Sequence, residues 1–84
     1  MNDNNYVLVN VQEAFKVAFD INPQLVSMET TASDIAAWDS TGHLSLVGHL
    51  EELFNISLDV DELMGMESVR EIVRIVSAKL SEKV

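Results

Sequence analysis

A hydroxyl group next to a carboxylate is the feature of this sequence that most suggests chemistry. Asp39 and Ser40 stand together where a segment with helical spacing begins. At a helix start, unpaired backbone N–H groups and the positive end of the helix dipole favour an anion, so a phosphodiester on Ser40 would be well placed. A serine in this position more often only caps its helix. The pair alone leaves both interpretations open.

Ser40 and His43, with a nearby carboxylate, also suggest a catalytic triad. The nucleophile-elbow pattern is absent, however, and 84 residues leave little room for an oxyanion hole and a substrate cleft. We therefore set the catalytic triad aside.

The histidines and aspartates do not fall at metal-binding spacings. His43 and His49 are six residues apart, which places them on different sides of a helix, and we interpret both as surface histidines. Asp59 and Asp61 begin like a calcium loop, but Arg70 stands where the bidentate glutamate belongs. We expect no metal site.

The charge of the chain bears on its partners. Fourteen Asp and Glu residues stand against five Lys and Arg residues, for a net charge of −9, and no basic residue lies between Lys16 and Arg70. Such a surface repels nucleic-acid phosphates and attracts basic protein surfaces. Cysteine is absent, which excludes disulfides and thiolate zinc sites. We expect protein partners with basic patches and no nucleic acid.

The chain shows no targeting or membrane signal. Its first residues lack the basic start and apolar stretch of a signal peptide, and no uninterrupted apolar run exceeds four residues. With 48% hydrophobic residues, the chain is expected to pack as one domain over residues 1–84. We also expect a monomer in the cytoplasm, without membrane insertion.

Apolar residues recur at helical spacing in three segments, and these predict helices over 6–19, from residue 39 to 55, and from 68 to about 81. A capping box that begins at Asp59 predicts a short helix that ends at Gly65. Residues 20–38 lose the helical period and predict a long loop with a short helical turn. The predicted fold is all-α, a small four-helix bundle of three main helices and one short one.

Trp38, the single tryptophan, directly precedes Asp39. An aromatic residue in this position is either a contact for a partner or an anchor for the long loop. We interpret Trp38 as the anchor, because a large apolar ring is usually buried.

Taken together, these segments resemble the acyl carrier protein family. Residues 38–56 are similar to the segment around the family's modified serine, in which Asp-Ser is followed by an amphipathic helix that ends in acidic residues, then Phe and a short turn. Residues 19–26 resemble the end of the family's first helix and the loop after it, and residues 68–76 resemble its last helix. The resemblance covers roughly residues 7 to 80 without an obvious gap.

The resemblance implies an acyl-carrier-protein-like bundle that acts as a freestanding carrier and is not an enzyme. Its cofactor would be 4'-phosphopantetheine, which a phosphopantetheinyl transferase attaches from coenzyme A to Ser40, beside Asp39. Acyl groups would travel as thioesters on this arm to acyl-loading and acyl-transferring enzymes with basic docking patches. The residues that the resemblance places at the partner surface are Thr41, Leu44, Glu51, Glu52, Asp59, Asp61 and Glu62.

Three departures from the family pattern bear on the pathway. Thr41 replaces the usual leucine, and Gly42 and Ser45 stand where acidic residues are common in fatty-acid carriers. They favour a dedicated lipid or secondary-metabolite pathway over general fatty acid biosynthesis. Two alternatives stay open: an aminoacyl or peptidyl carrier, and an unmodified acidic helical interaction module. Ser40 separates the module from the carriers, because only a carrier needs its hydroxyl.

Overall fold

Three long helices and one short helix make up the part of the chain that the computed structural model describes, residues 3–82. The long connection between the first two helices contains two 3-10 turns, η1 and η2. In chain order the elements are α1 (Asp3–Phe19), η1 (Pro23–Leu25), η2 (Ala32–Asp34), α2 (Ser40–Phe54), α3 (Val60–Met64) and α4 (Val69–Glu82). The predicted all-α fold of three main helices and one short helix is confirmed.

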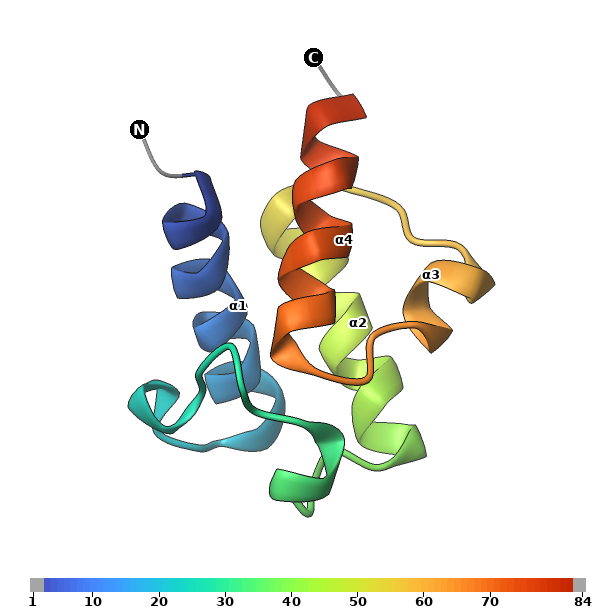
Figure 1. Ribbon diagram of the computed structural model, residues 1–84. Helices are drawn as coiled ribbons and strands as arrows, with labels where there is room; N and C mark the ends of the chain where they lie inside the picture. Colours follow the sequence, from blue (N-terminus) through green and yellow to red (C-terminus); the bar gives the residue numbers. More distant parts are fainter. Residues whose placement is uncertain (1–2, 83–84) are drawn as a thin grey trace.

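The first helix, α1, runs antiparallel to both α2 and α4 and packs against each of them (Figure 1). The long connection crosses the end of the bundle where α1 ends and where α2 and α4 begin, and α3 lies on the side of the bundle away from α1 (Figure 1). Backbone hydrogen bonds fasten this connection to the start of α4: Val69 N–H donates to the Thr30 carbonyl at 2.8 Å, and Ala32 N–H donates to the Glu67 carbonyl at 3.3 Å. The second 3-10 turn is therefore held beside the start of α4.

Apolar side chains from α1, α2 and α4 meet in a single core. The predicted face of α1 is confirmed, since Val7, Val11, Ala14 and Phe15 are all at most 1% exposed. The remaining buried apolar residues are Val26, Trp38, Leu46, Val47, Leu50, Phe54, Ile56, Met66, Val69, Ile72, Val73, Ile75 and Val76. Because Leu46, Val47, Leu50 and Phe54 of α2 belong to this core, it fixes α2 against α1 and α4.

Two residues on the apolar pattern of α2 do not belong to the core. Leu44 is 64% exposed and Leu53 is 44% exposed. Leu44 lies in the first turns of α2, where the helix passes the end of its neighbours, and it faces a surface cavity instead. An exposed leucine next to Ser40 is a feature of the candidate site.

The ends of the helices follow the expected capping chemistry. Asp39 caps α2, and Asn55 ends it in the left-handed conformation, with φ 54°. Both halves of the predicted capping box between Asp59 and Glu62 are present at α3. At α4, Ser68 Oγ accepts a hydrogen bond from the Glu71 amide at 3.2 Å, while the Glu71 carboxylate pairs with Arg74. None of the described helices is both long and apolar enough to cross a membrane.

Candidate functional site

Ser40 is the first residue of α2, and Asp39, which precedes it, is the helix cap. The Asp39 carboxylate accepts a hydrogen bond from the Gly42 amide at 2.8 Å, and the Asp39 carbonyl accepts one from the His43 amide at 2.7 Å. Ser40 is exposed, and within residues 3–82 no group forms a hydrogen bond with its hydroxyl. Because Asp39 performs the capping, the Ser40 hydroxyl is free for another role.

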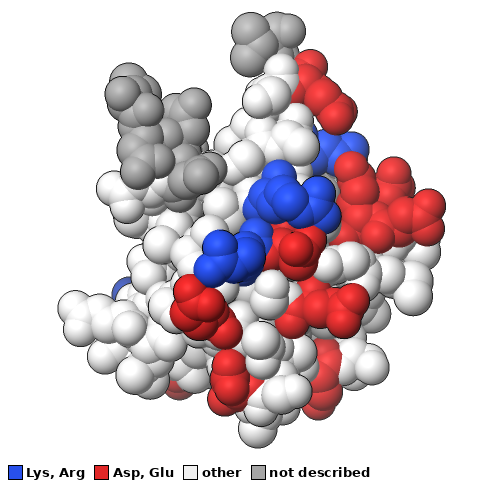
Figure 2. Space-filling model, viewed as in Figure 1, with Lys and Arg blue, Asp and Glu red and all other residues white. Residues whose placement is uncertain are grey.

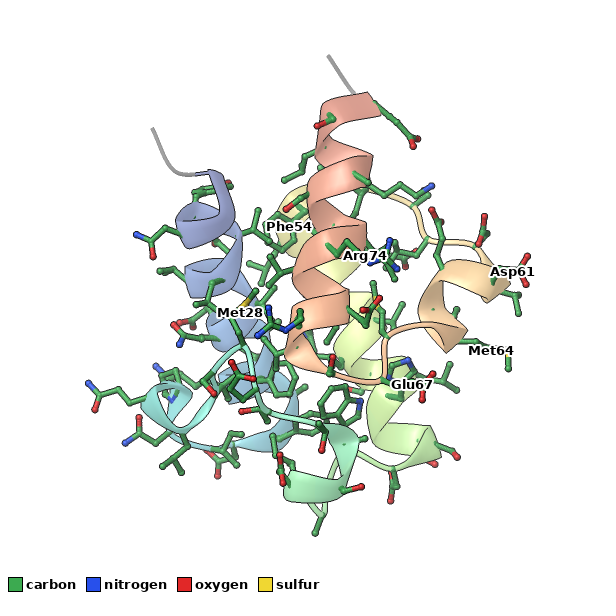
Figure 3. The ribbon with its side chains drawn as sticks, in the orientation of Figure 1. Met28, Phe54, Asp61, Met64, Glu67 and Arg74 are labelled. Atoms are coloured by element: carbon green, nitrogen blue, oxygen red, sulfur yellow. The ribbon has the colours of Figure 1, made fainter. Side chains whose placement is uncertain are left out.

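A cavity of about 930 Å³ opens beside this hydroxyl. Its walls come from η2, the start of α2, the end of α3 and the connection that precedes α4. Ser40 and Leu44 lie on the α2 side, and Met64, which is 69% exposed, lies on the α3 side. Figure 3 shows Met64 and Asp61 pointing outward from α3, away from the bundle. The structure therefore brings Asp39, Ser40 and Leu44 together around one cavity.

The imidazole of His43 joins three segments at the wall of this cavity. Its Nδ1 atom accepts a hydrogen bond from the Trp38 indole N–H at 2.8 Å, and its Nε2 atom lies 2.6 Å from the Leu63 carbonyl oxygen. A ring that accepts at Nδ1 and donates at Nε2 is the neutral tautomer with its proton on Nε2. The interpretation of His43 as a surface histidine is therefore wrong: the ring is partly buried and connects α2 to Trp38 and to α3.

Trp38 anchors the long connection, as the sequence predicts. The indole is 4% exposed and meets the Phe15 ring edge to face, with 5.0 Å between the ring centroids. The Trp38 and His43 rings, joined edge to edge by their hydrogen bond, lie in nearly the same plane, with 14° between the ring planes and 6.2 Å between the centroids. The residue directly before Asp39 is thus tied to the core on one side and to α2 on the other.

This arrangement offers no catalytic triad and no metal centre. Both nitrogen atoms of the His43 ring already have partners, so neither is available to take a proton from Ser40. Among residues 3–82, no group of three or more His, Asp or Glu side chains is arranged to hold a metal ion.

Gly42 is required by a close approach of two backbone segments. A Cβ atom at this position would collide with the Ala37 carbonyl oxygen and would lie 2.9 Å from the Phe19 ring. Any larger residue would push the start of α2 away from the long connection. The absence of an acidic side chain at position 42 thus has a steric cause.

Three of the predicted acidic residues have internal partners. Glu51 accepts a hydrogen bond from the Leu58 amide at 2.8 Å, and Asp59 and Glu62 cap α3 reciprocally. Glu62 also pairs with Lys79 of α4 at 2.9 Å. The Asp59 amide and the Lys79 ammonium lower the pKa of the Glu62 carboxyl, and the hydrogen bond to Glu62 raises the pKa of Lys79.

The other predicted surface residues are open to solvent. Thr41, Glu52 and Asp61 are exposed. In Figure 2, acidic side chains gather along the side of the molecule on which α3 lies, while basic side chains gather over α4. Glu52 is not close to Ser40, since twelve residues of helix place it roughly 18 Å away along the axis of α2. The acidic residues therefore form a broad surface rather than a pocket around Ser40.

The sequence alone does not predict two features of the site: the hydrogen bonds of His43 and the steric need for glycine at position 42. The partner of His43 on α3 is a backbone carbonyl twenty residues later, which no side-chain pattern reveals. For Gly42, the only available signal is that glycine within a helix is less stable than alanine, and Gly48 gives the same signal without any close contact.

A comparison with solved structures places the chain in a family. The solution NMR structure of a holo acyl carrier protein from Geobacter metallireducens matches it with a TM-score of 0.82 and 32% sequence identity, over 92% of this chain and 88% of that chain. Neither a protein-family model nor a curated protein gives a significant match to the sequence. On this identity, coverage and shared four-helix architecture, the chain belongs to the acyl carrier protein family, whose members are carriers and not enzymes.

Proposed function

We propose that the protein carries acyl groups on a 4'-phosphopantetheine arm attached to Ser40 and delivers them to partner enzymes. The observation that carries this proposal is the exposed Ser40 hydroxyl at the first residue of α2, beside an open cavity and without a hydrogen-bond partner in the described chain. The similar protein from Geobacter metallireducens is a holo acyl carrier protein, which supports the presence of the arm.

The residues around Ser40 suit a phosphodiester. Helix amides at an N-terminus lack partners within the helix, and the helix dipole places positive potential there, so a phosphate on Ser40 would be stabilised. The cavity volume of about 930 Å³ lies in the range of small-molecule sites, which leaves room for the arm. When bound, the arm supplies the thiol on which acyl groups are held as thioesters, and this chain has no cysteine of its own.

We assign partner contacts to the surface around and beyond Ser40. Thr41 and Leu44 lie next to the hydroxyl, and Glu52 and Asp61 offer free charge to basic patches on the transferase and on acyl-handling enzymes. Glu51, Asp59 and Glu62 add charge to this surface although their carboxylates also have internal partners. The threonine and glycine that follow Ser40 favour partners from a dedicated lipid or secondary-metabolite pathway.

Enzymatic labelling tests the site. The parent protein is incubated with a fluorescent coenzyme A derivative, magnesium and a broad-specificity phosphopantetheinyl transferase, alongside Ser40→Ala and Ser45→Ala. Ser45 is the matched control, because it is also an exposed serine of α2. We expect label on the parent and on Ser45→Ala and none on Ser40→Ala, with all three helical by circular dichroism. Label on Ser40→Ala would refute the site.

A further inference from the structure

We propose that His43 is a specificity-determining residue that closes the apolar core against the cargo, so that the acyl group stays in the cavity beside Ser40. The inference rests on the proposed function, since it concerns the cargo of the carrier. It assigns that cargo to short acyl groups or acyl groups with polar substituents, rather than to long unbranched alkyl chains.

The first support is the place of His43 between the cavity and the core. His43 follows Ser40 by less than one helical turn and lines the same cavity. Behind it the aromatic rings form a continuous layer: His43 and Trp38 lie edge to edge, joined by their hydrogen bond and with 14° between the ring planes, and Trp38 meets Phe15, which is 0% exposed. An alkyl chain that moves from Ser40 toward the core meets this layer first.

The second support is that the His43 ring is held at both nitrogen atoms. The hydrogen bond to the Leu63 carbonyl spans the gap between α2 and α3, and the bond from Trp38 holds the opposite side of the ring. An alkyl chain that displaced the ring would leave the Trp38 indole N–H without an acceptor, and it offers no polar atom to replace the imidazole. The Leu63 carbonyl would lose its shorter hydrogen bond and would keep only the one from the Met66 amide at 3.3 Å. The barrier is thus chemical as well as steric.

The third support is that α3 is fastened on its other side. Glu62 pairs with Lys79 of α4 at 2.9 Å, and Met66, two residues after the end of α3, is 2% exposed and belongs to the core. Because α3 is held by α2 through His43 and by α4 through Lys79, it cannot swing away from the cavity without loss of one of these contacts. The wall of the cavity is therefore fixed at both edges.

The lining of the cavity indicates what it holds well. The polar residues Thr31, Ser33 and Glu67 line it together with the apolar residues Leu44 and Met64. A short acyl group with hydroxyl, keto or amide substituents can satisfy both kinds of surface. A long alkyl chain would remain largely in water, because the core residues behind the wall are already closely packed.

The absence of cysteine allows a test that needs no enzyme. In a Ser40→Cys variant, the introduced cysteine carries the only thiol in the chain. This thiol reacts with butyl, octyl or dodecyl methanethiosulfonate. The reaction joins the alkyl chain to the protein through a mixed disulfide and releases methanesulfinate. The alkylated forms are compared in three backgrounds: Ser40→Cys alone, with His43→Val, and with His49→Val. His49 is the matched control, since it is a histidine of the same helix that does not line the cavity. The readouts are the melting temperature and the NMR shifts of the Leu46 and Leu50 methyl groups.

We expect melting temperatures and core methyl shifts that do not change with alkyl length in the Ser40→Cys and His49→Val backgrounds. In the His43→Val background we expect both to change progressively from butyl to dodecyl, because the chain then enters the core. A His43→Gln variant offers an acceptor oxygen and a donor NH2 group in place of the imidazole. In this variant the melting temperature and the methyl shifts should again be independent of alkyl length. If His43→Val does not fold, Trp38→Phe keeps the aromatic packing while it removes the N–H donor, and it should show the same trend.

Core methyl shifts with the dodecyl chain in the Ser40→Cys background would overturn the proposal. So would an absence of length dependence in the folded His43→Val or Trp38→Phe background. Because the alkyl chains are attached without a transferase, these outcomes are independent of whether Ser40 accepts phosphopantetheine. A failure of the proposed function is seen only in the labelling experiment above.

Discussion

The indole N–H of Trp38 donates a hydrogen bond of 2.8 Å to Nδ1 of His43, five residues later in the chain. This bond spans Asp39 and Ser40 and joins the end of the long connection to the first turn of α2. The other nitrogen of His43 bonds to the Leu63 carbonyl of α3. Ser40 therefore lies where side-chain hydrogen bonds connect the long connection, α2 and α3, and we call this set of contacts the frame of Ser40. The position of the Ser40 hydroxyl is thus set by side chains that do not bond to it.

Removal of the His43 ring should loosen this frame. We expect His43→Ala to lower the free energy of unfolding by about 1 to 3 kcal/mol, because the buried Trp38 N–H loses its acceptor. The Trp38 indole proton should also exchange with solvent faster, as measured by hydrogen exchange in NMR spectra. His49→Ala is the control and should leave this exchange unchanged. Equal exchange rates in the parent and His43→Ala would show that the bond does not protect Trp38.

Gly42 and Gly48 should respond to alanine in opposite directions. A Cβ at Gly42 collides with the Ala37 carbonyl, whereas nothing lies within 4 Å of a Cβ at Gly48. We expect Gly42→Ala to destabilise the fold by about 1 to 3 kcal/mol through overpacking. Gly48→Ala should stabilise it by roughly 0.5 to 1 kcal/mol, since alanine favours a helix interior. Urea unfolding measures both, and a Gly42→Ala variant as stable as Gly48→Ala would contradict the close approach.

The hydrogen bond from the Asp59 amide to Glu62, together with the ion pair of Glu62 with Lys79, predicts a dependence of stability on pH. The pKa of Glu62 is lowered from its ordinary value of 4.5, so its contribution to stability is fully present above that value and is lost as pH falls through the lower pKa of the folded state. We therefore expect the difference in unfolding free energy between the parent and Glu62→Gln to be largest near neutral pH and to shrink in acid. In a Lys79→Met background the difference near neutral pH should be smaller. A difference that is constant from neutral to strongly acidic pH would rule this linkage out.

Charge reversal at free acidic residues should slow loading by the transferase. Glu52→Lys combined with Asp61→Lys should reduce the loading rate most at low salt, because electrostatic steering is screened as ionic strength rises. Glu13→Lys is the control, since Glu13 is equally exposed but lies on α1. Loading rates that are unchanged at low salt, or reduced equally by Glu13→Lys, would argue against docking through this acidic surface.

Local signals in the sequence predict most of the fold. The buried face of α1 follows from the spacing of Val7, Val11 and Phe15, and α3 follows from the capping box at Asp59. Helix α1 begins at Asp3 rather than Tyr6, because its polar first turn carries no apolar periodicity. Leu44 fits the helical pattern yet is exposed, since a binary pattern cannot show where a helix extends past its neighbours.

The candidate site is only partly predictable in the same way. The place of Asp39 and Ser40 at a helix start depends on capping chemistry within a few residues, which the sequence displays. The environment of His43 depends on how the long connection and α3 pack against α2, and both Trp38 and Leu63 reach it through tertiary contacts. Such contacts are properties of the packed bundle rather than of any segment.

The central claim, that Ser40 bears the arm, is tested most directly by intact mass spectrometry. The folded protein is incubated with coenzyme A, magnesium and a broad-specificity phosphopantetheinyl transferase, with Ser40→Ala treated in parallel. The account predicts a mass increase of one phosphopantetheine on the parent and none on the variant. No increase on the folded parent would contradict it and would favour an acidic helical interaction module.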